Sequence, residues 1–320
     1  MSLRESMLKR FVVVVAALLF LPVLVADAAT GDLSLRYRGT AHDALFDISF
    51  DNSFGIAVGG GGTVLASEDG GLSWAHYVRP DTSLALLGVI AEGGKRFAVG
   101  QSGQIFRLDG DSWSPLESGT DARLFSIALG HNGLVVVVGG FGTILVSHDN
   151  GATWSAATID WMPILNDYVE PHLYAVQIQN GVITVAGEFG LILRSLDDGA
   201  SWTVAHRGEA SIFDFSIDQK GLGLAVGQEG LVLATADGGA SWRESGRLSG
   251  TPLLGVWQSG ARAFAVGIRG GYASNDGGRN WKSVTRSDIE TGWYQAVASS
   301  ASRDKPVLVG HRGRILEVDE

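Results

Sequence analysis

The chain has 320 residues, of which 45 are glycine and none is cysteine, and its formal net charge at pH 7 is −10. The lack of cysteine excludes a disulfide framework and a thiol nucleophile. The acidic balance disfavours a general nucleic-acid binder, which replaces counterions with basic side chains. Many glycines in a chain that is 45% hydrophobic indicate a folded protein with many tight turns.

The first residues predict a secretory signal. Three basic residues among the first ten precede an apolar run over 11–25, and small residues at 26–28 suit a cleavage site. A retained membrane anchor is the less favoured alternative, because a bilayer span needs roughly 20 apolar residues. We therefore expect a signal peptide over 1–28 and an exported mature chain without a transmembrane segment of its own.

A repeated unit with the pattern V-G-x-x-G-x-I/V-L-x-S-x-D-x-G-x-S-W follows the predicted signal. Its period is near 40 residues, which suits the four short strands and turns of a propeller blade. Seven units can be counted from their opening glycines: Gly59, Gly100, Gly139, Gly187, Gly227, Gly267 and Gly310.

The first unit predicts four strands, over 45–50, 55–58, 63–67 and 73–78. The first of these alternates apolar and polar residues, as a half-buried strand does. The glycine-rich bend at 59–62 is short enough for a hairpin that needs positive φ.

The stretch Ser67 to Trp74 is an Asp box, in which the carboxylate accepts turn N–H groups and the tryptophan packs between sheets. The turn hydrogen bonds and the packing of the tryptophan are sufficient to explain why these residues recur, so we assign the boxes a structural role. The residues so assigned are Ser67, Asp69, Trp74, Ser147, Asp149, Trp154, Ser195, Asp197, Trp202, Asp237, Trp242, Asp276 and Trp281.

Three units depart from the pattern. The second has a shortened box at 108–113, the sixth is one residue short before Ser274, and the seventh stops after its third strand, at 314–318. An additional strand is predicted at 33–38, before the first unit. We expect it to complete the last blade, because closure leaves no exposed edge. The prediction is an all-β, seven-bladed propeller that forms a single domain over 29–320.

The segments 45–59 and 69–74 resemble the photosystem II stability and assembly factor family and, more loosely, the bacterial neuraminidase (Asp-box) repeat. The resemblance extends over essentially the whole mature chain. It implies a lumenal or periplasmic propeller that, in phototrophs, holds newly made reaction-centre subunits during assembly. Photosynthetic members carry an arginine-rich patch, for which Arg269, Arg279, Arg312 and Arg314 are candidates without a residue-by-residue match.

The candidate binding surface is the end of the propeller that carries the turns between second and third strands, here called the G-x-x-G face. Phenylalanines at two turns and an aromatic insertion at 160–168 are expected there, the insertion being either a self-packed plug or a binding patch. Basic residues opposite them would complete a surface for an extended peptide. The predicted partner-binding residues are Phe141, Trp161, Met162, Tyr168, Glu188, Phe189, Arg269, His311, Arg312 and Arg314.

Enzyme chemistry is disfavoured. A sialidase requires an Arg-Ile-Pro segment that the sequence lacks, and the pair Glu188 and Glu229 is more typical of solvated turns. The seven histidines have no metal-ligand spacing, and the glycine-rich bends precede strands rather than a phosphate-binding helix. No catalytic residue, metal or cofactor is predicted.

The sequence thus predicts a non-enzymatic scaffold or assembly factor of the periplasm, or of the thylakoid lumen in a phototroph. Its partner would be a protein or a membrane-protein complex, bound on one propeller face. A glycan-binding or sialidase-like Asp-box protein of the cell envelope is the alternative. An accessory subunit of an envelope transport complex is a third possibility that the sequence leaves open.

Overall fold

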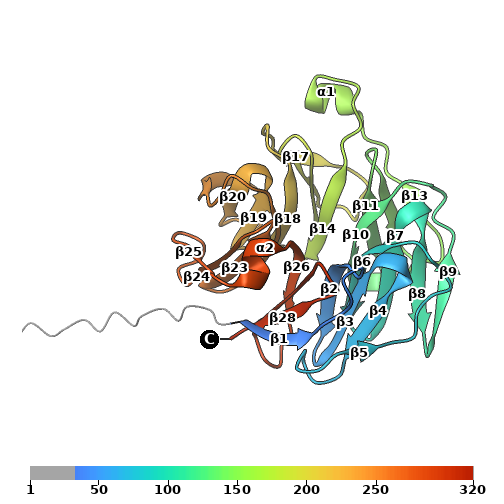
Figure 1. Cartoon of the computed structure of the whole chain (residues 1–320). Coiled ribbons are helices and arrows are strands. Elements are labelled where there is room, and N and C mark those ends of the chain that lie inside the picture. The colour runs from blue at the N-terminus through green and yellow to red at the C-terminus, as the bar shows by residue number, and fades with distance from the viewer. Residues whose placement is uncertain (1–32, 320) are drawn as a thin grey trace, which may run out of the picture.

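The computed structural model describes residues 33–319, in which seven four-stranded antiparallel sheets surround a central axis (Figure 1). The signal predicted over 1–28 lies outside the described residues. No helix within 33–319 has the length and apolar character needed to cross a bilayer. The predicted all-β, seven-bladed architecture is confirmed.

The first strand of each unit is innermost and contacts the innermost strands of both neighbouring blades. Blades 1 to 3 consist of β2 (Leu45–Asp51), β3 (Phe54–Gly59), β4 (Val64–Ser67) and β5 (Ala75–His76); β6 (Leu86–Glu92), β7 (Lys95–Gly100), β8 (Ile105–Asp109) and β9 (Ser112–Leu116); and β10 (Leu124–Leu129), β11 (Val135–Gly139), β12 (Ile144–Ser147) and β13 (Ser155–Ala156).

Blades 4 to 6 consist of β14 (Leu173–Gln179), β15 (Val182–Gly187), β16 (Ile192–Ser195) and β17 (Thr203–His206); β18 (Ile212–Ile217), β19 (Gly223–Gly227), β20 (Leu231–Thr235) and β21 (Arg243–Arg247); and β22 (Leu253–Ser259), β23 (Arg262–Gly267), β24 (Gly271–Ser274) and β25 (Lys282–Ser283). Two short helices, α1 (Trp161–Leu165) and α2 (Ser287–Thr291), lie in the connections before blades 4 and 7. Short 3₁₀ turns occupy Gly60–Gly62, Gln101–Gly103, His131–Gly133 and Gln228–Gly230.

Blade 7 joins the two ends of the described chain. It contains β26 (Tyr294–Ser299), β27 (Pro306–Gly310), β28 (Ile315–Val318) and, outermost, β1 (Leu33–Tyr37). The β1 strand pairs antiparallel with β28, so that Leu33 lies opposite Val318. Closure by the N-terminal strand is therefore confirmed, and no sheet edge is left between the first and last blades.

Each interface between neighbouring blades has its own apolar core, giving seven buried clusters. The second strand of a blade is covered on both faces, which is why β11 reads as four consecutive buried valines. Tryptophans of the Asp boxes join these clusters, as Trp74 does between blades 7 and 1. Packing between blades therefore supplies the core in place of disulfides.

The Asp-box turns are held by a repeated set of hydrogen bonds. In blade 3, the Ser147 hydroxyl donates to Asp149 over 2.8 Å and accepts the Gly151 N–H over 2.8 Å. Asp149 also accepts the N–H and hydroxyl of Thr153, at 2.8 and 2.6 Å. The hydrogen bonds from Thr153 and Ser147 lower the pKa of Asp149 to about 2. Blade 5 makes the same turn with Thr235 in place of serine.

Candidate functional site

The G-x-x-G turns and the starts of the innermost strands lie at the same end of the propeller. Leu45, which begins β2, pairs with Gly59 at the end of β3, and the Gly60 N–H donates to Ala44 just before β2. The same arrangement recurs in the other blades, so residues at the start of the innermost strand border the central channel next to the turns.

Every innermost strand contains a β-bulge at its start. The register against the second strand shifts across one residue in all seven blades. A bulge re-aims the side chain of the extra residue. The residues at the shift are Phe46, Leu87, Phe125, Tyr174, Phe213, Leu254 and Gln295, and all seven line a cavity of about 310 Å³ at the channel mouth. We call these seven residues the mouth ring.

Aromatic side chains connect the mouth ring to the outer surface. Ring centroids are separated by 5.0 Å between Phe141 and His172, 6.2 Å between His172 and Phe125, 5.6 Å between Phe125 and Tyr174, and 5.2 Å between Tyr174 and Phe213. Phe141, at the outer end, is 67% exposed, whereas the other four are half-buried. We call this continuous series the aromatic arc. It offers a partner an apolar path from a turn tip to the channel.

A second aromatic group lies on the blade 7 side of the mouth. Phe46 stacks on Trp293 at 5.9 Å, and Trp293 is 6.3 Å from His311. His311 also contacts Tyr294 edge-on at 5.7 Å. Burial, followed by the nearby positive charge of Arg314, lowers the pKa of His311. The predicted contact residue His311 is therefore a half-buried aromatic neighbour of the mouth ring.

The tips of the G-x-x-G turns have left-handed backbone conformations. Gly61 in blade 1 has a φ of 63°, yet the equivalent tips in blades 3 and 4 are Phe141 and Phe189, with φ of 55° and 58°. Arg269 and Arg312 occupy the same position with φ of 57° in blades 6 and 7. A bulky residue is strained there, and such strain gathers at functional sites. Both arginines are exposed, as their predicted role requires.

The insertion at 160–168, between blades 3 and 4, is partly packed against the protein and partly exposed, and thus combines the plug and the binding patch that the sequence left open. The α1 helix stands out from the end of the molecule near β14 (Figure 1), but Trp161 at its start is only 8% exposed and packs in the core between blades 3 and 4. A side chain at Gly142 would collide with its indole. Met162 and Tyr168 remain exposed.

Two predicted contact residues are therefore corrected to structural roles. Trp161 anchors the insertion to the core. Arg314 is buried, and its guanidinium donates to Asp288 of α2 over 2.7 Å. A buried, paired charge serves to fix α2 against β28 rather than to contact a partner.

Glu188 is half-buried and accepts the His172 N–H over 2.8 Å and the Tyr174 hydroxyl over 3.3 Å, which holds two members of the aromatic arc in place.

Sequence reasoning missed most of the aromatic arc and the mouth ring. Phe46 lies in the first strand predicted for the first unit, and Phe125, Tyr174 and Phe213 were not singled out. The available signal was their equivalent position, directly after the first buried residue of each unit. Across residues 33–319, no group of His, Asp and Glu side chains is arranged to hold a metal.

Residues 107–209 match the profile of the family described as Photosynthesis system II assembly factor YCF48. The resemblance to this family is confirmed. The matched segment contains Phe125, Phe141, His172 and Tyr174, and thus four of the five residues of the aromatic arc. Comparison with curated protein sequences found no match.

Solved structures share the fold. YCF48 bound to D1 peptide is 18% identical with a TM-score of 0.69, over 92% of this chain and 98% of that chain. YCF48 from Cyanidioschyzon merolae is 18% identical with a TM-score of 0.68, over 89% and 98%. The WD40 β-propeller domain of Doa1 is 12% identical with a TM-score of 0.71, over 91% and 97%. At these identities the likeness establishes the fold alone.

Proposed function

We propose that this protein is a non-catalytic assembly factor that binds a polypeptide segment of a client protein on the G-x-x-G face. The observation that carries the proposal is the aromatic arc, which joins exposed Phe141 to the half-buried mouth ring without a break. Aromatic anchors dominate interface energetics. The family match over 107–209 and the structure of YCF48 bound to D1 peptide support a peptide as the ligand.

The proposed contact surface has an apolar side and a basic side. Phe141, Phe189 and Tyr168 are exposed over blades 3 and 4, and Arg269 and Arg312 are exposed over blades 6 and 7. An extended segment with apolar residues at one end and acidic residues at the other would match both sides. We propose a membrane-protein complex as the source of this segment.

The test is affinity capture from native membranes with the wild-type protein and a Phe141→Ala/Phe189→Ala variant. Removing two anchors should lower recovery of the client by at least about 30-fold, since a single interface hot spot contributes about 2 kcal/mol. Leu196→Ala is the matched control, because Leu196 is 70% exposed at the Asp-box end of blade 4. Equal recovery by the double variant and the control would refute the proposed surface. Retention on glycans but not on proteins would favour the carbohydrate alternative.

We further propose that residues 1–28 direct export, to the periplasm or, in a phototroph, to the thylakoid lumen. Export would place the propeller beside the lumenal or periplasmic segments of membrane proteins. N-terminal sequencing of protein purified from its source should find Ala29 first. An intact Met1 would contradict cleavage.

A further inference from the structure

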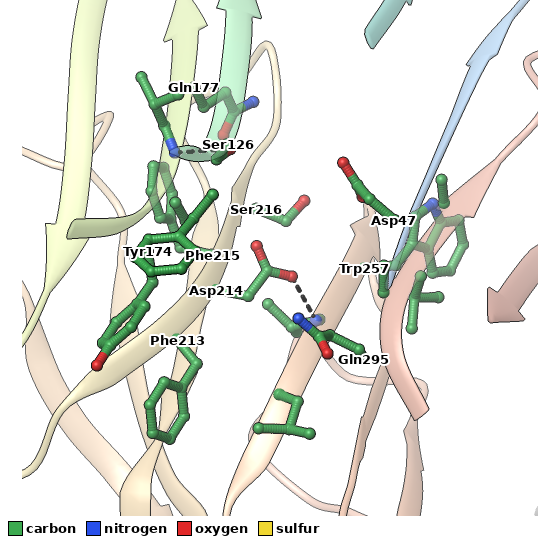
Figure 2. Close-up of a pocket in the computed structure, with 18 of the residues that line it drawn as sticks. Asp47, Ser126, Tyr174, Gln177, Phe213, Asp214, Phe215, Ser216, Trp257 and Gln295 are labelled. Carbon is green, nitrogen blue, oxygen red and sulfur yellow. Dashed lines mark hydrogen bonds between the residues drawn. The ribbon is translucent and has the colours of Figure 1, made fainter. Parts of the chain in front are cut away.

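Beneath the mouth ring, a cavity of about 400 Å³ continues along the channel. Among its lining groups, residues 33–319 contribute two carboxylates: Asp47 from blade 1 and Asp214 from blade 5. Figure 2 shows the two side chains entering the cavity from different blades, with Tyr174 and Phe213 beside Asp214. Asp47 and Asp214 each directly follow a mouth-ring aromatic, so their Cα atoms lie about one residue rise, or 3.3 Å, further along the strand.

Backbone amides hold both carboxylates in place. Asp47 accepts the Ile48 N–H over 2.8 Å and, from the next blade, the Val89 N–H over 2.7 Å. Asp214 accepts the Val256 N–H of the next blade over 2.9 Å. These bonds cap the open inner edges of β6 and β22. A carboxylate oxygen accepts two hydrogen bonds, so each group keeps acceptor capacity toward the cavity.

The charges of the two carboxylates are not compensated within residues 33–319, where neither makes an ion pair. Burial raises the pKa of Asp47 to about 7, and burial together with the Asp47 charge raises that of Asp214 to about 7. The Tyr174 phenol is the other titratable group in the lining, and Arg123 lies above it at the mouth.

We propose that the channel binds one cationic side chain, lysine or arginine, of the client segment. The alkyl stem would pass the aromatic faces of the mouth ring, which attract a cation. Its N–H groups would reach Asp47 and Asp214, which offer acceptors and negative charge. This inference rests on the proposed function for its partner, but the site can be tested with a small ion alone.

The experiment titrates the purified protein with n-butylammonium, a mimic of the lysine side chain, and with n-butanol, its uncharged equivalent. The reporters are the backbone amide NMR signals of Val89 and Val256, which donate to the two carboxylates. The ammonium ion should shift both signals in a saturable way. The alcohol should bind at least about tenfold more weakly, because it lacks the charge.

Two further arms identify the groups responsible. Asp47→Asn/Asp214→Asn should lower the ammonium affinity at least about tenfold, whereas Glu244→Gln, which removes an exposed carboxylate from blade 5, should leave it unchanged. In the wild-type protein, affinity should rise about tenfold or more from pH 5.5 to 8.5, as the two carboxyl groups ionise.

Equal binding of alcohol and ammonium, or full affinity in the double asparagine variant, would overturn the inference. If that variant does not fold, the ligand pair and the pH profile on the wild-type protein decide. Ammonium binding without client capture would refute only the proposed function. Client capture without ammonium binding would refute only the cation site.

Discussion

At the residue scale, the turn tips combine a strained backbone with the contact surface that we propose. The equivalent position is glycine in blade 1 but phenylalanine in blades 3 and 4, with a positive φ in each case. A non-glycine residue in this conformation costs roughly 1 kcal/mol. The Phe141 ring is 67% exposed and recovers little of this cost by burial, so we expect it to make a contact outside the chain.

Phe141→Gly should therefore stabilise the fold by about 1 kcal/mol while weakening client capture. The backbone N–H of residue 141, which donates to His172, is retained in this variant. Urea unfolding measures the first effect and membrane capture the second. A less stable glycine variant would show that the phenylalanine ring stabilises the fold by more than the positive φ at position 141 costs.

The channel carboxyl groups should make stability fall as pH rises. Their pKa is about 7 in the folded protein and near 4 when unfolded, so the folded state holds more protons between these values. Stability should decline from pH 4 to 7 by roughly 2 to 4 kcal/mol for each of the two groups and level off above about pH 8. Chemical denaturation across this range measures the slope.

Asp47→Asn/Asp214→Asn should flatten that slope. The Asp boxes act in a different range: the pKa of Asp149 is about 2, so its stabilisation is complete above about pH 4 and is lost as pH falls toward 2. A wild-type stability that rises between pH 4 and 7 would contradict the assignment of the channel groups.

At the scale of elements, the closing strand is locked by a buried ion-pair network. Glu317 on β28 is fully buried, and its carboxylate accepts from Arg36 of β1 at 2.7 Å and from Arg303 at 2.6 and 3.0 Å. Removing the charge would leave Arg303 without its counter-ion and Arg36 with only Asp319, at 4.0 Å. The network therefore couples the outermost strand to the rest of blade 7.

Glu317→Gln should destabilise the protein by about 3 kcal/mol, because breaking a buried pair leaves uncompensated charge. Arg247→Ala, which breaks an exposed pair with Glu229, is the comparison and should cost less than about 1 kcal/mol. Thermal unfolding of both variants measures the difference. Equal melting temperatures would mean that the Glu317 network does not hold the closing strand.

The repeat pattern predicted the blades, their order and the closure, because each depends on local periodicity and on turns that the sequence displays. It did not predict the mouth ring, since a bulge depends on pairing with the neighbouring strand. The burial of Trp161 was also not predicted from the sequence. The aromatic Trp161 resembled an exposed anchor in sequence, yet it fills the gap over Gly142.

At the scale of the whole molecule, the propeller gathers one residue from each blade at the channel mouth and continues this apolar surface outward to blade 3. The opposite end carries the Asp boxes, whose polar groups are engaged in their own turns. The two ends therefore differ in their capacity for contact. We therefore expect the client on the G-x-x-G face and not at the Asp-box end.

The most direct test of this assignment is photocrosslinking in native membranes from a photoreactive phenylalanine analogue placed at Phe141 or at Leu196. These positions lie at opposite ends of the propeller and are 67% and 70% exposed. Position 141 should crosslink to one client polypeptide and position 196 should give none. Crosslinks from position 196 alone would show that the client contacts the Asp-box end instead.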